Sequence, residues 1–253
     1  MKVSIVTATY NSEAHIADCV KSVDSQTYGD IEHIIIDGAS NDNTIKTIMG
    51  MPNRVRRVVS EPDKGIYDAM NKGIDCATGD VIGILNSDDF FTSNDVINSI
   101  VKEFASDSTL EGIFTDLYYV SRNNPDRIVR YWVSSSFKKG GFFKGWHPPH
   151  PTLYLKREVY EKYGNFNLDF SFSADFDLML RFFEKHNIKT KYLPITTVKM
   201  RLGGPSNNYL KNLRKQNVQC INAFRVNGFK PPLLYPMYRV LPKLLQFFKR
   251  ENE

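Results

Sequence analysis

Two adjacent aspartates, Asp88 and Asp89, follow an almost continuous apolar run over residues 81–85. Such a run is typical of a parallel strand that is covered on both faces of its sheet. Two neighbouring acids at the end of a core strand repel each other, and a divalent cation with oxygen ligands would stabilise them. The alternative is that both acids cap a helix that begins near Thr92 and Ser93. The motif alone favours neither interpretation.

A second pair of acids, Asp175 and Asp177, stands at the start of a helix that the spacing of Leu178, Phe182 and Lys185 predicts. As acids of a first helical turn, they would complement the helix dipole and need no further role. A carboxylate held beside a substrate hydroxyl can instead act as a general base. The pattern of residues leaves both interpretations open.

The elements that must position these acids alternate between strands and helices in the first half of the chain. Strands are expected at residues 3–8, 31–36, 55–59 and 81–85. Helices are expected after an N-cap at Ser12, near residues 44–48, and over residues 65–77 with Ile66, Ala69, Met70 and Gly73 on the core face. Because parallel neighbours need crossover connections, this alternation predicts a doubly wound α/β fold with a mainly parallel sheet.

Polar residues follow each of the four expected strands, at residues 7–11, 37, 61–63 and 86–89. In doubly wound sheets, ligands bind beyond the carboxyl ends of the strands. Four polar strand ends at one edge therefore indicate a ligand site. The sequence contains neither the glycine fingerprint of a dinucleotide fold nor a P-loop, which argues against a nicotinamide enzyme and against a P-loop ATPase.

Four segments, SIVTATYNSE, IIIDGASNDNT, DKGIYDAMNKGIDCATGD and ILNSDD, occur in this order within about the first hundred residues. Together they resemble the family 2 inverting glycosyltransferases of the GT-A fold, as found in bacterial polysaccharide biosynthesis. The resemblance implies a Rossmann-like doubly wound sheet with a small acceptor-side subdomain and a helical C-terminal tail. It also implies a nucleotide-sugar donor, for which UDP is the expected nucleotide, and a glycan hydroxyl as acceptor.

The resemblance also implies which residues bind the donor. The first strand end would pack on the nucleoside, and Asp37 would hold the base. The segment containing Lys64 and Asn71 would close over the nucleoside and the sugar. The full implied set is Thr7, Ala8, Thr9, Tyr10, Asp37, Lys64, Asn71 and Asp88.

A Mn²⁺ or Mg²⁺ ion is the cofactor that this resemblance implies, since a Lewis acid stabilises the charge that develops on a departing diphosphate. Asn86 stands where the family often has the first acid of its Asp-x-Asp motif. We therefore expect Asp88 and Asp89 to supply the metal contact jointly. On the acceptor side, the segment around Asp175 resembles the family's Glu-Asp motif with Ala174 replacing Glu, which makes Asp175 the expected base and Asp177 the second choice.

The second half of the chain offers weaker candidates. Strands at residues 112–119 and 128–133 predict a small antiparallel layer, followed by a helix over residues 156–163 and a strand near residues 191–193. His150 is either a metal or acceptor ligand or a structural residue in a proline-rich turn. The run from residue 198 to 206 is either a surface loop or a lid whose Arg201 or Ser206 reaches the diphosphate.

Charge is distributed unevenly along the chain. Residues 1–120 hold nine Lys and Arg against 19 Asp and Glu, a net charge of −10, whereas residues 121–253 hold 24 against nine, a net charge of +15. The basic half suits phosphates or an anionic membrane face, and the lack of a dense basic run argues against nucleic acid. Without a signal-peptide pattern or a long apolar run, we expect a cytoplasmic protein.

We expect a donor-binding half over residues 1–120, an acceptor and base half over 121–228, and an amphipathic basic tail over 229–253. Prolines at 231, 232, 236 and 242 break the tail, so it would either lie on the inner face of the plasma membrane or pack on the domain. Two other functions stay open. A nucleotidyltransferase would release pyrophosphate, and a non-catalytic nucleotide-sugar binding protein would not need Asp175.

Overall fold

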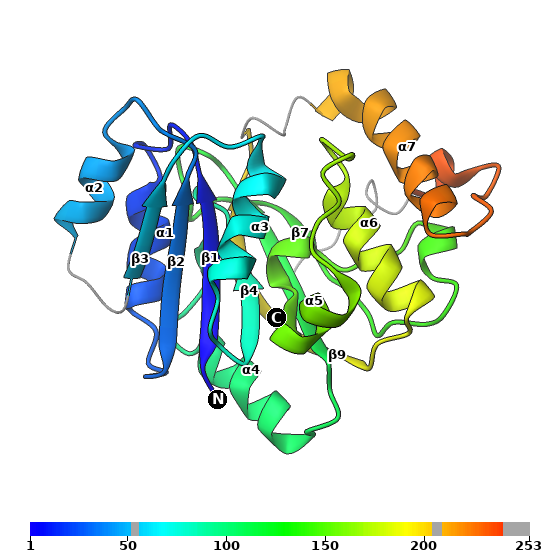
Figure 1. Ribbon diagram of the computed structural model, residues 1–253, viewed down its shortest axis with the longest axis horizontal. Helices are drawn as coiled ribbons and strands as arrows, with labels where there is room; N and C mark the ends of the chain where they lie inside the picture. The colour runs from blue at the N-terminus through cyan, green and yellow to red at the C-terminus, as the bar shows by residue number, and fades with distance from the viewer. Residues whose placement is uncertain (52–55, 204–208, 240–253) are drawn as a thin grey trace.

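A computed structural model describes residues 1–51, 56–203 and 209–239 (Figure 1). Within them, nine strands form a single sheet in the order β3-β2-β1-β4-β8-β6-β9-β5, and β7 pairs with β6. The strands are β1 (Val3–Thr9), β2 (Ile31–Asp37), β3 (Arg56–Ser60), β4 (Val81–Ile84), β5 (Phe90–Phe91), β6 (Gly112–Val120), β7 (Ile128–Trp132), β8 (Tyr154–Lys156) and β9 (Thr190–Arg201). The helices are α1 (Ile16–Asp24), α2 (Thr44–Gly50), α3 (Ile66–Cys76), α4 (Val96–Ser106), α5 (Arg157–Tyr163), α6 (Ala174–Leu180) and α7 (Tyr209–Val226), and a π-helix over Arg181–Lys185 continues α6.

The first four strands confirm the predicted parallel sheet. β1 pairs in parallel with β2 and with β4, and β2 pairs in parallel with β3. Helices form the crossovers between them. Because the strands are parallel, the carboxyl ends of β1, β2, β3 and β4 point to the same edge, at the top of Figure 1. The polar strand ends therefore do converge, as the alternation of elements predicts.

Two details of these crossovers differ from the expectation. Helix α1 begins at Ile16, and the hydroxyl of Ser12 donates to the carbonyl of Tyr10 instead of capping the helix. Helix α4 begins at Val96, so Asp88 and Asp89 lie too early in the chain to cap it. The capping interpretation of the two acids is therefore wrong.

The sequence analysis missed two short strands and part of a third. β8 inserts antiparallel between β4 and β6, and β5 pairs antiparallel with β9. β9 is also longer than the strand expected near residues 191–193. Its pairing with β6 shifts register between Phe114 and Asp116, opposite Pro194, which interrupts the ladder. Arg201 consequently ends a strand and is not part of a surface loop.

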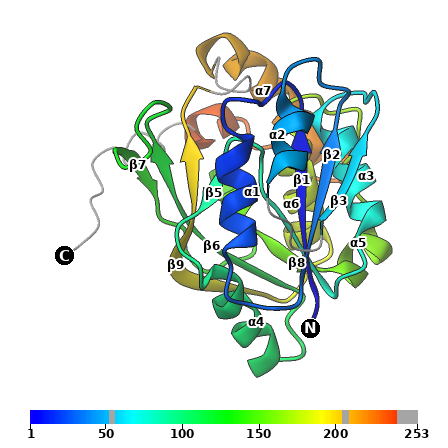
Figure 2. The ribbon, with the colours of Figure 1, turned by 90° about the vertical axis from the view of Figure 1, so that its left-hand side faces the viewer.

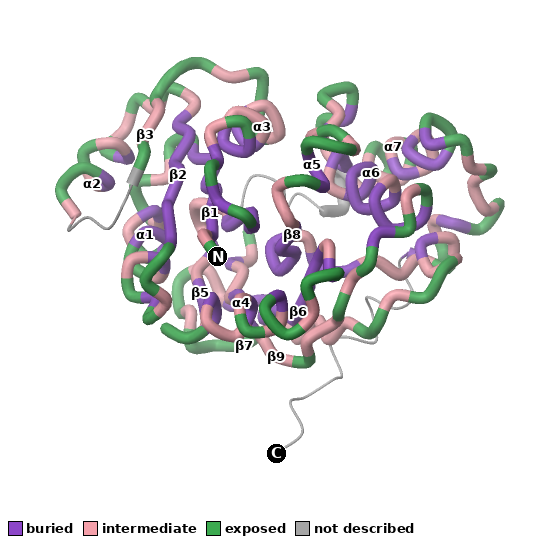
Figure 3. The backbone as a smooth tube through the Cα atoms, turned by 60° about the horizontal axis from the view of Figure 1, so that its bottom comes forward, coloured by how far each residue is buried: buried purple, intermediate pink, exposed green. Residues whose placement is uncertain are grey.

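Helices cover both faces of the sheet, as a doubly wound fold requires. Figure 2 shows α1 and α3 on opposite sides of β1 and β2. One core lies under α1, α2 and α4, and the other lies under α3, α5, α6 and α7. Figure 3 shows the buried residues concentrated in the strands and on the helix faces that meet them. Gly73 allows the close approach of α3, because a Cβ there would lie 2.3 Å from Cγ1 of Val6.

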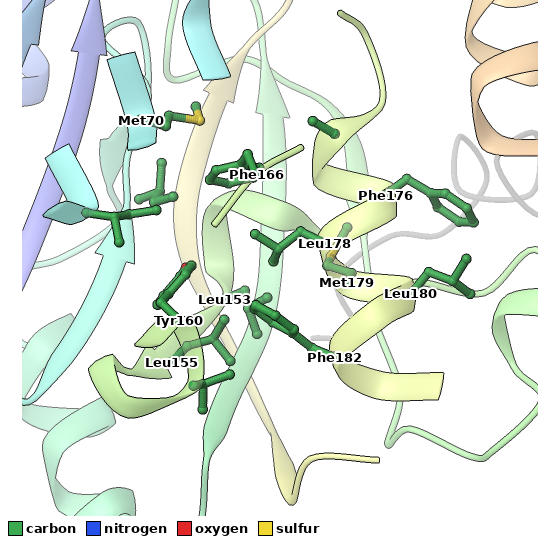
Figure 4. Packing of buried hydrophobic residues seen from close by; sticks show 14 of the residues in the cluster. Met70, Leu153, Leu155, Tyr160, Phe166, Phe176, Leu178, Met179, Leu180 and Phe182 are labelled. Carbon is green, nitrogen blue, oxygen red and sulfur yellow. The ribbon is translucent and has the colours of Figure 1, made fainter. Parts of the chain in front are cut away.

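The core beneath α3 extends into the second half of the chain and fixes α6. Phe176, Leu178 and Phe182 pack in the same cluster as Met70 of α3 and Phe166 (Figure 4). This packing joins the helix that carries the second pair of acids to the first half of the chain. Ile66 is an exception to the predicted core face of α3, since it is exposed.

In the described part of the tail, residues 229–239, some side chains pack in the core and others are exposed. Tyr235 is fully buried against Phe176 and Phe224, whereas Leu233 is 96% exposed. Residues 240–253 lie outside the described part of the chain. Among the described residues, no helix has the length and apolarity needed to cross a bilayer.

Candidate active site

A cavity of about 460 Å³ lies beyond the carboxyl ends of β1 and β4. Its walls come from the loop after β1, the start of α3, the loop after β4, the ends of β6 and β9, and the segment before α6. The lining residues are Ala8, Thr9, Tyr10, Asn11, Ser12, Ala14, His15, Asp63, Gly65, Ile66, Ala69, Asn86, Ser87, Asp88, Arg122, Ser171, Phe172, Met200 and Arg201. The hydroxyls of Ser12 and Ser87 lie 2.9 Å apart and tie the first and fourth strand ends together.

The residues at the end of β1 face two different regions, the cavity and the core. Ala8, Thr9 and Tyr10 line the cavity, and the ring of Tyr10 is 60% exposed. The hydroxyl of Thr7 instead lies 3.0 Å from Nε2 of His33 in the core, so the structure does not bring Thr7 to the cavity. The buried hydroxyl of Thr9 has no hydrogen-bond partner within the described residues.

Asp37 ends β2, does not line the cavity, and organises the loop that follows. Its carboxylate accepts hydrogen bonds from the backbone N–H of Ser40 at 3.0 Å and from the hydroxyl of Ser60 at 2.7 Å. Gly38 lies close to Asp63, since a Cβ there would lie 2.4 Å from Oδ2 of Asp63 and would displace that side chain. The hydroxyl of Ser40 accepts from the backbone N–H of Asn11, a cavity residue, and so connects the Asp37 loop to the cavity wall.

The two acids after β4 have different environments. Asp88 lines the cavity, whereas Asp89 is fully buried and accepts hydrogen bonds from Nδ2 of Asn86 at 2.8 Å and from the backbone N–H of Arg201 at 3.3 Å. Burial and the neighbouring charge of Asp88 raise the pKa of Asp89 well above its usual value. Asp89 therefore connects β4 to β9, and Asp88 is the acid that faces the cavity.

Two guanidiniums stand on the same side of the cavity. Nη1 of Arg201 donates to the carbonyl of Asp88 at 2.8 Å, and Nη2 forms an ion pair with Asp18. Nη1 of Arg122 lies 3.6 Å from Oδ2 of Asp88. Burial and these two cations lower the pKa of His15, which therefore adds no positive charge at neutral pH.

The donor atoms at this end of the cavity fit a hard divalent cation that also binds a substrate. Within the described residues, no group of three or more His, Cys, Asp or Glu side chains is arranged to hold a metal by itself. Asp88 does supply a carboxylate next to the oxygen-bearing side chains of Asn86 and Ser87. One or two carboxylates that share a cation with substrate phosphates form the common arrangement for Mg²⁺.

Asp175 lies in the first turn of α6 and accepts a hydrogen bond from the hydroxyl of Tyr67 at 3.2 Å. Tyr67 follows the cavity residue Ile66 in α3, so this bond connects the acid to the cavity wall. Burial and the charge of Asp175 raise the pKa of the Tyr67 phenol well above its usual value, which keeps this hydroxyl a donor. Tyr67 is a residue that sequence analysis did not single out.

Asp177 and His150 differ in their surroundings. Asp177 is buried and accepts a hydrogen bond from Nδ2 of Asn227 at 2.8 Å, and burial raises its pKa. It therefore joins α6 to the end of α7. The ring of His150 packs edge-on against Phe166, and burial lowers its pKa although the charge of Asp175 opposes that effect. His150 is consequently a neutral ring near Asp175.

The other candidates differ in their relation to the cavity. The amide of Asn71 donates to the carbonyl of Phe166 and accepts from its N–H, both at 2.9 Å, so this side chain anchors the loop before α6. Lys64 is exposed between the cavity residues Asp63 and Gly65. Ser206 lies outside the described residues. The lid interpretation is wrong for Arg201, which is buried at the end of β9, although its side chain still lines the cavity.

The mainly parallel sheet, with a cavity beyond the carboxyl ends of β1 and β4, is the arrangement expected of the GT-A fold. A model of the family described as Glycosyl transferase family 2 matches residues 4–164. An uncharacterised glycosyltransferase of Mycobacterium tuberculosis is 33% identical over 181 residues, which cover 71% of this chain and 68% of that protein. A PGL/p-HBAD biosynthesis glycosyltransferase of Mycobacterium bovis is 28% identical over 214 residues, covering 81% and 78%. The chain therefore belongs to glycosyltransferase family 2.

Solved structures share the fold at lower sequence identity. A mannosyltransferase from Pyrobaculum calidifontis in complex with GDP-Man and Mn²⁺ matches with a TM-score of 0.68 at 18% identity, covering 95% of this chain and 68% of that chain. S. aureus TarS matches with a TM-score of 0.63 at 15% identity, covering 88% of this chain and 40% of that chain. These likenesses confirm the GT-A fold.

Proposed function

We propose that this glycosyltransferase is metal-dependent and inverting, and that it moves a sugar from a UDP-sugar to a hydroxyl of a growing, lipid-linked glycan. The observation that carries the proposal is the connection from the cavity to Asp175. Ile66 lines the cavity, and the next residue of α3, Tyr67, holds the Asp175 carboxylate at 3.2 Å. One helix thus bounds the proposed donor site and positions the proposed base.

The donor would lie along the strand ends. Tyr10 presents an exposed ring on which a nucleobase can stack, with Ala8 and Thr9 beneath it and Asp37 fixing the adjoining loop. The diphosphate would lie toward Asp88, whose carboxylate would hold a Mn²⁺ or Mg²⁺ ion. Lys64, beside the cavity, stays a proposed donor contact, and Asn71 is proposed to act through the loop that it anchors.

The chemistry is a single displacement. Asp175 accepts the proton of the acceptor hydroxyl while that oxygen attacks the anomeric carbon from the face opposite the diphosphate. The bond between the anomeric carbon and the diphosphate oxygen breaks, and the nucleoside diphosphate leaves with the electron pair. When bound, the cation supplies Lewis-acid stabilisation of the charge on that leaving group. The guanidinium of Arg201 and the cavity-facing Asp88 are fixed to each other and keep this end of the site in place.

The solved structures of similar fold support a nucleotide sugar as donor, but they differ in which nucleotide sugar they bind. TarS has been solved in complex with UDP and with UDP-GlcNAc, and the mannosyltransferase in complex with GDP-Man.

We propose the division into a donor half over residues 1–120, an acceptor half over 121–228 and a tail over 229–253. We also propose that the exposed apolar residues of the tail bind the inner face of the plasma membrane, where a lipid-linked acceptor would lie.

A thermal-shift screen of nucleotide sugars with Mn²⁺ tests the donor, because a ligand that binds the native state raises the melting temperature. A UDP-sugar should give the largest shift, and a larger shift with a GDP-sugar would overturn the choice of UDP. Product analysis then tests the reaction. Release of nucleoside diphosphate with inversion at the anomeric carbon supports the proposal, whereas release of pyrophosphate would indicate a nucleotidyltransferase.

A further inference from the structure

Arg122 stands two residues beyond the end of β6, and its side chain lines the cavity next to the loop after β4. Its Nη1 lies 3.6 Å from Oδ2 of Asp88, which is beyond hydrogen-bond distance. The same Nη1 is buried and has no hydrogen-bond partner in the described part of the chain. The pair is therefore held by charge attraction without a hydrogen bond.

The guanidinium of the neighbouring Arg201, in contrast, is held by several contacts. It pairs with Asp18, donates to the carbonyl of Asp88, and lies 4.7 Å over the ring of Phe90. Arg201 is 3% exposed, whereas the side chain of Arg122 is 37% exposed. Of the two cations, Arg122 is the one whose guanidinium can change partner at little cost.

A cation bound to Asp88 and the guanidinium of Arg122 would compete for one carboxylate. Two positive groups a few ångströms apart repel each other, and Asp88 carries a single negative charge. A nucleoside diphosphate changes this balance, because its oxygens offer new acceptors to a guanidinium, whose planar fork matches phosphate geometry. The cavity is therefore arranged for an exchange of partners.

We propose that Arg122 is a positioning residue that neutralises Asp88 in the free enzyme and turns to the donor diphosphate when a divalent cation takes Asp88. This inference rests on the proposed function. It requires positive coupling between cation and nucleotide, since each ligand removes an obstacle to the other. Replacing Arg122 should then change the two affinities in opposite directions, which loss of a purely structural contact would not do.

The test measures Mn²⁺ binding by electron paramagnetic resonance and UDP binding by calorimetry, for the wild type, Arg122→Gln and Arg122→Lys. Without nucleotide, Arg122→Gln should bind Mn²⁺ about 3- to 10-fold more tightly, since a partly exposed ion pair contributes on the order of 1 kcal/mol. With Mn²⁺ present, it should bind UDP about 10-fold more weakly, the loss expected for a charge-assisted hydrogen bond. Arg122→Lys should lie between the two proteins in both measurements.

Arg127→Gln is the matched control, because Arg127 is an exposed arginine in the nearby β6–β7 turn and does not line the cavity. It should leave both affinities at their wild-type values. Weaker or unchanged Mn²⁺ binding in Arg122→Gln would overturn the exchange. If the wild type binds Mn²⁺ but no nucleotide, the proposed function fails, and the Mn²⁺ measurement still decides whether Arg122 competes for Asp88.

Discussion

The guanidinium of Arg201, at the end of β9, forms an ion pair with the carboxylate of Asp18 in α1, 183 residues earlier in the chain. The same guanidinium donates to the carbonyl of Asp88 in the loop after β4. The last strand of the described sheet is thereby joined to the first helix and to the cavity. This contact holds the basic half of the chain against the acidic half at the proposed diphosphate end of the site.

Arg201→Gln should lower the free energy of unfolding by about 2 kcal/mol or more, because the buried guanidinium is lost and the carbonyl of Asp88 loses a charged donor. Asp18→Asn should cost less than about 1 kcal/mol, because the Asp18 side chain is 55% exposed and solvent screens the pair. Denaturant unfolding of both variants measures the difference. Equal losses would mean that the ion pair, and not the carbonyl contact, stabilises this junction.

Local patterns in the sequence were enough to predict the first four strands and the polar loops that follow them. Each strand is a buried apolar run, and the polar residues after it lie at the edge that parallel pairing dictates. The pattern failed at β5 and β8, which are two and three residues long and show no period. It was incomplete at β9, where a strand was expected only near residues 191–193 and a loop or lid over residues 198–206, whereas one strand runs from Thr190 to Arg201.

Within the site, sequence reasoning found the acids and missed their partners. Asp88 and Asp175 belong to short motifs, and so a local pattern marks them. Tyr67 reaches Asp175 across 108 residues, and Arg122 reaches Asp88 only because β6 pairs beside β9. Such contacts depend on tertiary packing, for which a single sequence carries no local signal.

The two acids after β4 should respond differently to substitution. Asp88→Ala should remove the stimulation of turnover by Mn²⁺ and leave the melting temperature nearly unchanged, because Asp88 faces the cavity. Asp89→Ala should lower the free energy of unfolding by about 1–3 kcal/mol, since Asn86 and the N–H of Arg201 lose their acceptor. Assays in chelator-treated buffer and thermal melts measure both effects. Wild-type Mn²⁺ dependence in Asp88→Ala would contradict its role.

Asp175→Asn should lower turnover by roughly 10²-fold or more, because a positioned general base usually contributes that much to the rate. It should leave UDP affinity unchanged. Asp177→Asn is the natural comparison, because Asp177 lies two residues further along α6 and bonds to Asn227. It should reduce stability with little effect on turnover. Steady-state kinetics and calorimetry with UDP separate the two, and equal loss of UDP affinity in Asp175→Asn would make Asp175 a binding residue.

Glu32 provides a pH-dependent contribution to stability away from the site. Burial alone would raise its pKa, but hydrogen bonds from Lys2, Ser4 and Thr78 outweigh burial and lower the pKa from 4.5 to about 2. The ionised form is thus favoured in the folded protein. Its stabilising contribution is complete above the unfolded value of 4.5 and is lost as the pH falls toward 2.

Glu32→Gln should therefore lower the free energy of unfolding by about 1–3 kcal/mol at pH 7, with the difference from wild type shrinking between pH 4.5 and pH 2. Denaturant titrations at a series of pH values measure it. Glu158→Gln is the control, because the Glu158 side chain is 66% exposed. A difference that does not change with pH would show that the charge of Glu32 is not what stabilises the fold.

The described part of the tail presents apolar side chains next to cations. Leu233, Leu234, Met237 and Tyr238 are exposed, and Lys230 is exposed beside them. Lys144 is also exposed, and the next residue, Gly145, lies against the backbone of Tyr238. Apolar side chains that project from a basic surface suit an anionic bilayer, where each cation contributes on the order of 1 kcal/mol.

Removal of the whole tail would not test this idea, because Tyr235 is fully buried and its loss would open the core. The pair Leu233→Glu and Met237→Glu should instead reduce co-sedimentation with anionic vesicles at low salt by about 10-fold or more, since each apolar side chain contributes up to roughly 2 kcal/mol on burial. The melting temperature and UDP affinity should stay unchanged. Met49→Glu is the control, because Met49 is 69% exposed on α2, at the opposite end of the molecule in Figure 1. Vesicle binding that is equal in the wild type, the double variant and the control, or absent from all three, would refute a membrane role for the tail.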